Sequence, residues 1–310
     1  MEIQFVLNDK QVKAEVGADT ILLNVLRDLG CKSVKCGCET TNCGLCTVWI
    51  DGKSRLSCSV LAASVEGCEI TTLEGVEKEA AAFGAFLADE GAEQCGFCSP
   101  GFIMNVLAMF RELKNPSVDE IKEYLSGNLC RCTGYMGQLR AIQKYMQSGQ
   151  AAKNAGGQGR QHGGERMRTV NQPVRKVDYK ALVTGKAVYT NDLAPSDCLV
   201  VKVIRSPHAH ALIKEININR ALAVQGIECI LTYKDCPDKR FTMAGQTYPE
   251  PSPYDRLILD ERVRFVGDAV AIVAGTSEEA VVKAMKLVKV KYEVLEPVFG
   301  FSGRQRITRY

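Results

Sequence analysis

The sequence predicts an α+β protein made of three successive folded segments, and three observations support this fold class. Residues 2–16 alternate apolar and polar side chains as half-buried strands do. Residues 77–147 instead show the longer apolar spacing of helices, and a glycine-rich stretch separates them from a third segment of mixed pattern. A chain of 310 residues is long enough for two or three separate cores. The predicted domains are 1–75, 76–147 and 170–310, with a linker at 148–169.

The first segment is predicted to be a small α+β domain. Residues 2–7 and 12–16 flank a polar turn and form a hairpin. A short helix follows from Ile21 to Leu29 and ends at Gly30. After a loop rich in cysteine, Asp51-Gly52 is a strong signal for the turn of a second hairpin.

The second segment is predicted to be a small bundle of four short helices. Residues 102–113 form a strongly apolar helical stretch. Ser117 and Glu120 have the spacing of a capping box, which predicts the start of another helix. A last helix is expected from about Gln138 to Gln147. The cysteines of this segment fall at the turns between helices, where side chains from a bundle's end converge.

The third segment follows a stretch with six glycines at 148–166 and almost no apolar bulk, which predicts a flexible linker. These glycines do not complete a G-x-G-x-x-G pattern after a strand, so a phosphate-binding loop is not favoured. Beyond the linker, residues 199–204 and 264–274 resemble strands and residues 277–288 resemble a helix. A mixed α+β domain is therefore expected.

Charge and cysteine content narrow the function. Residues 1–150 carry 14 Lys/Arg against 19 Asp/Glu, a net charge of −5, whereas residues 151–310 carry 25 against 17, a net charge of +8. An acidic front half argues against nucleic acid as a partner. The N-terminus lacks a secretory signal, and no run of about 18 apolar residues predicts a membrane span. A cytoplasmic location is expected, and there clustered cysteines serve as metal ligands or redox groups.

Four cysteines of the first segment have the plant-type [2Fe–2S] spacing. Of the 14 cysteines, 11 lie before residue 150. The spacing C-x4-C-x2-C with a distant fourth cysteine wraps the chain around two tetrahedral irons. The candidate ligands are Cys38, Cys43, Cys46 and Cys58. Gly37 and Gly44 allow a close backbone approach, so that N–H groups point at the sulfurs.

A second set of four cysteines lies among the predicted helices. The candidate ligands are Cys95, Cys98, Cys130 and Cys132. The first pair precedes the apolar helix and the second follows a helix end, so the two pairs meet at one end of a bundle. Arg131 between two ligands offsets the negative charge of a thiolate cluster. Structural zinc is the alternative metal for either set, because C-x2-C spacing also suits zinc. Disulfides are the less favoured alternative.

The segments VKCGCETTNCGLCTVWIDGKSRLSC (34–58), QCGFCSPGFIM (94–104) and GNLCRCTGY (127–135) together resemble the iron–sulfur region of the molybdenum hydroxylases, the family of xanthine dehydrogenase and aldehyde oxidoreductase. The resemblance covers residues 1–147 almost without gaps. It departs at Thr41, where the family usually has glycine, and at the additional Cys36. It implies a β-grasp ferredoxin domain, a four-helix-bundle domain and two [2Fe–2S] clusters.

The resemblance continues beyond the linker, in GKAVYTNDL (185–193), RSPHAHALI (205–213) and RFVGDAVAIVA (264–274). These resemble the opening, hammerhead-like domain of the family's molybdenum-binding subunit, with no FAD domain in between. The resemblance implies that electrons pass from a molybdopterin-bound molybdenum through the second cluster to the first, and then to an external acceptor such as a ferredoxin or flavin protein. Gln94 and Cys132 match positions that lie against the pterin.

The part that binds molybdopterin in the family is not in this chain, so the resemblance implies an oxidoreductase that is inactive alone. The chain stops just after KYEVLEPV, where the family continues. Two hypotheses stay open: a truncated or frame-shifted product of a longer gene, or a short subunit whose catalytic part is a separate molybdenum-binding chain. The rival functions are a non-enzymatic zinc-binding module and a stand-alone ferredoxin-like carrier. By the same resemblance, the residues that select the substrate lie in the part that the family carries beyond this chain.

Several residues are predicted to have structural roles. Trp49 is expected in the core, and His208 and His210 are expected to be structural rather than metal ligands. Cysteines outside the two sets are expected to be spare thiols; they are Cys31, Cys36, Cys68, Cys198, Cys229 and Cys236.

Overall fold

A computed structural model of the chain describes residues 1–149, 174–195, 197–242, 254–297 and 299. The chain divides into two compact units, Met1–Leu193 and Ala194–Tyr310. The predicted glycine-rich linker, apart from residues 148 and 149, and the C-terminal tail from residue 300 lie outside the described residues. The predicted mixture of helices and strands is confirmed in both units.

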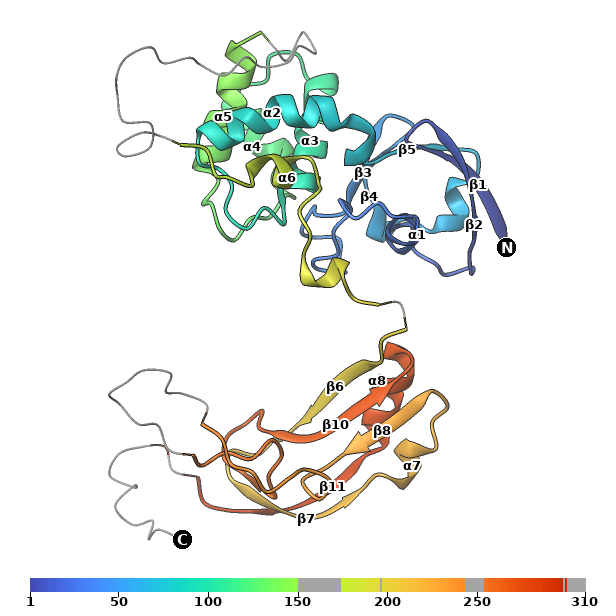
Figure 1. Cartoon of the computed structure of the whole chain (residues 1–310), viewed down its shortest axis with the longest axis vertical. Helices are drawn as coiled ribbons and strands as arrows, with labels where there is room; N and C mark the ends of the chain where they lie inside the picture. The colour runs from blue at the N-terminus through green and yellow to red at the C-terminus, as the bar shows by residue number, and fades with distance from the viewer. Residues whose placement is uncertain (150–173, 196, 243–253, 298, 300–310) are drawn as a thin grey trace. The chain divides into compact units, whose positions relative to one another are not determined.

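The first unit opens with a five-stranded sheet in the order β2-β1-β5-β3-β4, in which β1 and β5 are parallel and the other neighbours antiparallel (Figure 1). The strands are β1 (Glu2–Leu7), β2 (Lys10–Glu15), β3 (Thr47–Ile50), β4 (Lys53–Leu56) and β5 (Glu69–Thr71). Both predicted hairpins are confirmed, and their turns use positive φ at Asn8, Asp9, Asp51 and Gly52. Helix α1 (Leu22–Asp28) buries its leucines against one face of the sheet.

Four helices follow, and a fifth short helix packs beside them. They are α2 (Glu77–Asp89), α3 (Ser99–Glu112), α4 (Val118–Tyr124), α5 (Met136–Gln147) and α6 (Tyr179–Val183). The capping box at the start of α4 is confirmed. Helix α3 begins three residues earlier than the apolar pattern indicates, because Pro100 stands in its first turn, where proline is well tolerated. Phe83 and Tyr145 meet edge-to-face at 5.3 Å in the core between α2 and α5.

The sheet and the helices of the first unit share an interface through β3 and α3. Trp49, predicted in the core, is 2% exposed and donates its indole N–H to the carbonyl of Met104 at 3.0 Å. The Arg111 guanidinium lies 3.7 Å from the centre of the Trp49 ring. Ser54 donates to the side chain of Asn105 at 2.8 Å. These contacts hold the two cysteine-bearing parts of the unit together.

In its described residues, the second unit contains two three-stranded sheets, ordered β6-β10-β8 and β11-β7-β9. The strands are β6 (Val200–Arg205), β7 (Ala211–Asn217), β8 (Ile227–Leu231), β9 (Arg262–Val263), β10 (Ala269–Gly275) and β11 (Lys289–Val294). Helix α7 (Asn219–Leu222) and helix α8 (Glu278–Leu287) pack on the first of these sheets, and Ser277 caps α8. The predicted strands and helix of the third segment are thus present: β6 is shifted by one residue from its predicted bounds, β10 begins five residues later than predicted, and α8 is one residue shorter at each end.

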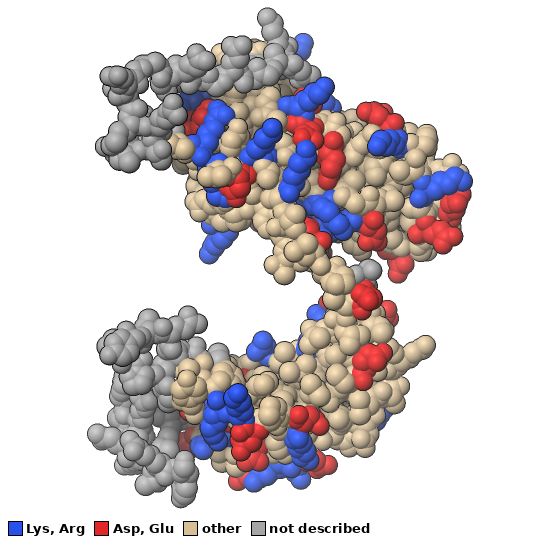
Figure 2. Space-filling view, viewed as in Figure 1, with Lys and Arg blue, Asp and Glu red and all other residues tan. Residues whose placement is uncertain are grey.

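The surface of the described residues gives two further observations. On the face shown in Figure 2, basic and acidic side chains are interspersed on both units. No helix in the described ranges is long and apolar enough to cross a membrane.

Candidate metal centres

The first cysteine set forms two pairs of interacting thiols. Cys38 interacts with Cys43, and Cys46 interacts with Cys58. Cys43 and Cys46 are buried, at 8% and 3% exposure, whereas Cys38 and Cys58 are partly exposed. The strand pair β3–β4 delivers Cys58 to Cys46, because Ser57, directly after β4, donates its backbone N–H to the Cys46 carbonyl at 3.2 Å.

The loop between Cys38 and Cys43 turns its backbone N–H groups toward a sulfur. Glu39 and Thr41 both have positive φ, at 53° and 63°. This backbone aims the N–H groups of Thr40 and Asn42 at the Cys38 sulfur, at 3.5 and 3.4 Å. The Thr40 N–H is the main cause that lowers the pKa of the Cys38 thiol to about 6. Thr41 occupies a left-handed position that favours glycine, which gives a physical reason for the glycine that the resemblance leads us to expect there; nothing in the structure explains the threonine.

The buried thiols of the first set are held in their neutral form. Burial raises the pKa of Cys46 to about 12 and also raises the pKa of Cys43. A bound metal reverses this effect, since a cation deprotonates a coordinating thiol outright. The set therefore combines one thiol prepared as a thiolate with buried thiols that ionise only against a metal.

The second cysteine set also forms two pairs, drawn from two distant loops. The Cys132 and Cys95 sulfurs lie 3.6 Å apart and both residues are exposed. Cys98, at the N-terminus of α3, interacts with Cys130. The prediction that the two sequence pairs meet at one end of the helices is confirmed by this geometry.

Neighbouring hydroxyl groups hold the loop of Cys130. The Thr133 hydroxyl donates to the Cys130 sulfur at 3.1 Å, and the Cys130 N–H donates to the Tyr135 hydroxyl at 2.9 Å. Burial opposes ionisation of Cys130, but hydrogen bonds led by that of Thr133 lower the pKa of its thiol. Burial and the neighbouring Cys130 raise the pKa of Cys98. This set thus also mixes a thiol favoured as thiolate with one that needs a metal to ionise.

A backbone hydrogen bond joins the two cysteine sets. The Leu129 N–H donates to the carbonyl of Cys43 at 2.9 Å, and Leu129 directly precedes Cys130. Next to it, the Asn128 side chain donates to the Gly44 carbonyl at 3.3 Å. A side chain at Gly44 would approach the Gly127 carbonyl to 2.6 Å. Gly44 is therefore required by the second loop as well as by the first.

Gln94 and Cys132, the predicted pterin-contact residues, lie side by side at the surface. The Gln94 side chain donates to the Cys132 carbonyl at 2.9 Å, and both residues are exposed. The preceding residue, Glu93, is 7% exposed, and neither of its carboxylate oxygens has a hydrogen-bond partner. Burial raises the pKa of Glu93 to about 8.

The thiol pairs fit a two-iron group. In the described part of the chain, no three His, Cys, Asp or Glu side chains converge closely enough to hold one metal ion. The cysteines instead lie as two pairs in each set, and a [2Fe–2S] cluster takes four thiolates shared between two irons. The donor set is entirely sulfur, which suits this cluster.

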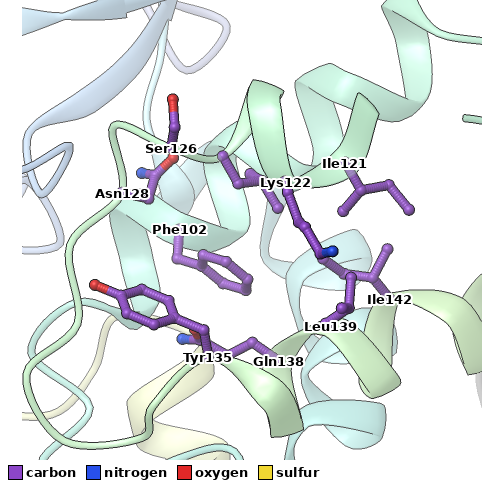
Figure 3. A pocket seen from close by; sticks show the side chains of 10 residues that line it. Phe102, Ile121, Lys122, Ser126, Asn128, Tyr135, Gln138, Leu139 and Ile142 are labelled. Carbon is purple, nitrogen blue, oxygen red and sulfur yellow. The ribbon is translucent and has the colours of Figure 1, made fainter. Parts of the chain in front are cut away.

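A cavity of ≈ 380 Å³ opens between helices α3, α4 and α5 (Figure 3). Its wall is mostly apolar, with Phe102, Leu125 and Leu139 among the lining residues. Tyr135 also lines it, and this is the residue whose hydroxyl holds the Cys130 N–H. The cavity is therefore next to the second cysteine loop, although no cysteine lines it.

The remaining residues singled out from the sequence lie in structural contacts. Cys36 donates to the Glu39 carboxylate at 3.2 Å, and Cys31 is buried in the core below the sheet. The His210 ring lies between the Glu296 carbonyl, at 2.8 Å, and the Arg262 guanidinium. His208 stacks edge-to-face on Tyr292 at 4.8 Å. Both histidines thus have packing partners.

The sequence analysis did not identify the residues that contact the cysteine loops but lie far from them in the sequence. Tyr189 donates its hydroxyl to the Cys95 carbonyl at 2.7 Å, and Asp192 pairs with Lys35 at 2.7 Å. These contacts span 94 and 157 residues, and no local spacing announces them. Thr133 could have been found, since it directly follows Cys132 in the motif GNLCRCTGY.

Two family models match the chain. Residues 72–143 match a [2Fe-2S] binding domain, and residues 184–296 match the a/b hammerhead domain of aldehyde oxidase and xanthine dehydrogenase. The xanthine dehydrogenase iron-sulfur-binding subunit of Escherichia coli O157:H7 is 43% identical over 137 residues, which are 43% of this chain and 86% of that protein.

Longer relatives match almost the whole chain. The probable hypoxanthine oxidase XdhD of Escherichia coli K12 is 30% identical over 308 residues, 97% of this chain and 32% of that protein. The solved aldehyde oxidoreductase of Desulfovibrio gigas superposes with a TM-score of 0.76 at 29% identity, over 96% of this chain and 34% of that chain. The chain belongs to the molybdenum hydroxylase family. It spans about a third of the length of these longer relatives, which are oxidoreductases by name.

Proposed function

We propose that this chain transfers electrons through two [2Fe–2S] clusters within a molybdenum hydroxylase. Cys38, Cys43, Cys46 and Cys58 hold the first cluster, and Cys95, Cys98, Cys130 and Cys132 hold the second. The hydrogen bond from the Leu129 N–H to the Cys43 carbonyl carries this proposal, because it joins a ligand of one set to the residue beside a ligand of the other. Each cluster, when bound, takes up and releases one electron.

The same arrangement supports a domain assignment. We assign residues 1–75 to a β-grasp ferredoxin domain, because a mixed five-stranded sheet carries one helix and the first cysteine loop. Residues 76–147 form a four-helix-bundle domain, and residues 170–310 include the hammerhead-like domain.

The chain's residues have distinct roles in this function. Backbone N–H groups around Cys38 and the Thr133 hydroxyl at Cys130 stabilise thiolate charge, which tunes the clusters they surround. Burial of Cys43 and Cys46 keeps water from the inner side of the first set. The exposed pair Gln94 and Cys132 provides the contact to a molybdopterin on a partner chain or a further part of the protein.

Membership of the family supports a proposal for the partners. A molybdenum-binding part supplies electrons from hydroxylation of a purine, another N-heterocycle or an aldehyde, and an external ferredoxin or flavin protein receives them. The many cysteines suit a reducing compartment, so we propose the cytoplasm.

Metal analysis and EPR test the proposal on the full chain produced with iron–sulfur assembly intact. We expect about four irons and four labile sulfides per chain and two distinct S = ½ signals after reduction. A colourless protein that contains zinc would overturn the proposal and leave a structural metal module. Purification without any molybdopterin protein, from cells that make one, would instead favour a stand-alone carrier.

A further inference from the structure

A short segment outside both cysteine sets contacts both of them. Residues Thr190–Asp192 form a 3₁₀ turn directly after Tyr189. The Tyr189 N–H donates to the Asp192 carboxylate at 3.1 Å, and the Asp192 N–H donates to the Tyr189 carbonyl at 2.8 Å. These two bonds fix the Asp192 carboxylate against the backbone of Tyr189. Both residues belong to the first compact unit, although the family match of the hammerhead domain begins at residue 184.

Asp192 holds the first cysteine loop. Its carboxylate accepts from the Lys35 ammonium at 2.7 Å and from the Arg27 guanidinium at 3.0 Å. The Lys35 and Asp192 side chains are only 1% and 5% exposed. The Lys35 backbone N–H donates to the Leu45 carbonyl, between Cys43 and Cys46, at 3.4 Å. Lys35 is therefore part of the loop that carries the first set.

Tyr189 holds the second cysteine loop. Its hydroxyl donates to the Cys95 carbonyl at 2.7 Å. Its ring meets Phe97, between Cys95 and Cys98, edge-to-face at 5.0 Å. The Lys35 ammonium lies 4.7 Å from the centre of the Tyr189 ring and 5.8 Å from that of Phe97. The buried cation of the first loop therefore lies near Phe97 of the second loop and Tyr189 of the segment between them.

The segment also lies close to the second loop at Gly96. A side chain at Gly96, which has a φ of +72°, would come within 2.5 Å of Leu182 in α6. Upstream, Arg175 pairs with Asp89 at the end of α2. Residues 174–193 thus run along the helices and end against the first loop, as the yellow segment of Figure 1 shows.

We propose that Tyr189 and Asp192 are positioning residues, which hold the two cysteine loops at a fixed separation and keep the Lys35 charge between them. The inference rests on the proposed electron-transfer function, because the spacing of two clusters and the charge between them govern transfer from one to the other. A buried ion pair such as Lys35–Asp192 is weak support for stability alone, and its better-attested use is to specify one arrangement.

The test uses the full chain, three substitutions and two control variants. Tyr189→Phe removes only the hydroxyl bond to Cys95 and keeps the ring packing. Asp192→Asn removes the negative charge, and Lys35→Met removes the positive one. Lys186→Gln is the matched control, because Lys186 lies on the same segment but pairs with Glu77 at the surface. Iron content, amide exchange of residues 95–98 and the midpoint potentials of both clusters are measured for each protein.

Tyr189→Phe should speed amide exchange at residues 95–98 about fivefold to tenfold, the effect of one lost hydrogen bond. Lys35→Met should lower both cluster potentials and Asp192→Asn should raise them, because a nearby positive charge favours the added electron. Lys35→Arg, which keeps the charge, should preserve the wild-type potentials.

Unchanged exchange and potentials in all three variants, at wild-type iron content, would overturn the positioning role and leave the proposed function intact. Potentials shifted alike by Lys35→Met and Asp192→Asn would also overturn it, since opposite charges were removed. Absence of iron from the wild-type protein would refute the proposed function, and the exchange of residues 95–98 would still test the contact.

Discussion

The two cysteine sets each bring four thiols together, but with different local structure. The first lies on a single stretch of 21 residues, Cys38 to Cys58, with two buried thiols and backbone N–H groups directed at a third. The second joins two loops that are 31 residues apart in sequence, and two of its cysteines are exposed. The difference teaches that the first set is built by local backbone geometry, whereas the second depends on the packing of helices.

The largest expected effect is the loss of one cluster without loss of the other. Cys46→Ser removes a buried ligand of the first set, so the first cluster should be lost while the second remains. Iron analysis should give about half the wild-type content, and EPR should show one signal. Cys98→Ser should remove the other signal.

Cys68→Ser is the control for these two variants, since Cys68 lies outside both sets and is partly exposed. It should keep wild-type iron content and both signals. If Cys46→Ser lost both clusters, the two sets would depend on each other for assembly, which would contradict the comparison drawn above.

The next effect tests the interface between the sets. A side chain at Gly101 would lie 2.3 Å from the Gly44 carbonyl, so Gly101→Ala should lower the free energy of unfolding by about 2 kcal/mol. Gly127→Ala is the control, because open space surrounds that position, and it should change the stability by less than about 0.5 kcal/mol. Urea unfolding followed by the fluorescence of Trp49, the single tryptophan, measures both. Equal stability of the two variants would contradict close packing of the loops.

A third prediction compares thiol chemistry in the cluster-free protein. The pKa of Cys38 is lowered to about 6, mainly by the Thr40 N–H, whereas interaction with Cys95 raises the pKa of Cys132. At pH 7 iodoacetamide should therefore modify Cys38 about tenfold faster than the exposed Cys132.

The alkylation rates of the two cysteines should also differ in how they depend on pH. A lowered pKa keeps Cys38 as thiolate at neutral pH, so its rate should fall only as the pH drops through about 6. The rate at Cys132 should already be falling well above that pH, because its thiol protonates at a raised pKa. Mass-spectrometric mapping of the adducts measures both profiles, and a common midpoint for the two cysteines would contradict the prediction.

The smallest effect concerns strain in the first loop. Thr41 has a φ of 63°, which is costly for a β-branched residue. Thr41→Gly should raise the free energy of unfolding by about 0.5–1 kcal/mol, after the entropy cost of glycine is subtracted. Thr40→Gly is the control and should lower stability, because Thr40 is not among the residues with positive φ. Thermal unfolding measures both, and a destabilised Thr41→Gly would show that the hydrogen bond from the Thr41 hydroxyl to the Thr40 carbonyl, at 2.6 Å, outweighs the strain.

Much of this molecule was predictable because its signals are local. Period-two alternation and the Asp51-Gly52 turn predict the hairpins. The capping box of Ser117 and Glu120 is recognised from only four consecutive residues. The cysteine spacings limit which thiols can share a cluster, since a short loop can place its sulfurs in few ways. The thiol pairs seen within each set agree with those spacings.

Contacts between segments distant in the chain could not be predicted in this way. The bond between Leu129 and Cys43, the need for glycine at 44 and 101, and the contacts of Tyr189 and Asp192 with both loops arise where separately formed segments pack together. The burial that raises the pKa of Cys46 and Glu93 is equally a product of packing. Spacing along the chain thus names the candidate ligands, while long-range packing sets the electrostatic surroundings in which they act, because burial and charge depend on neighbours that no local pattern specifies.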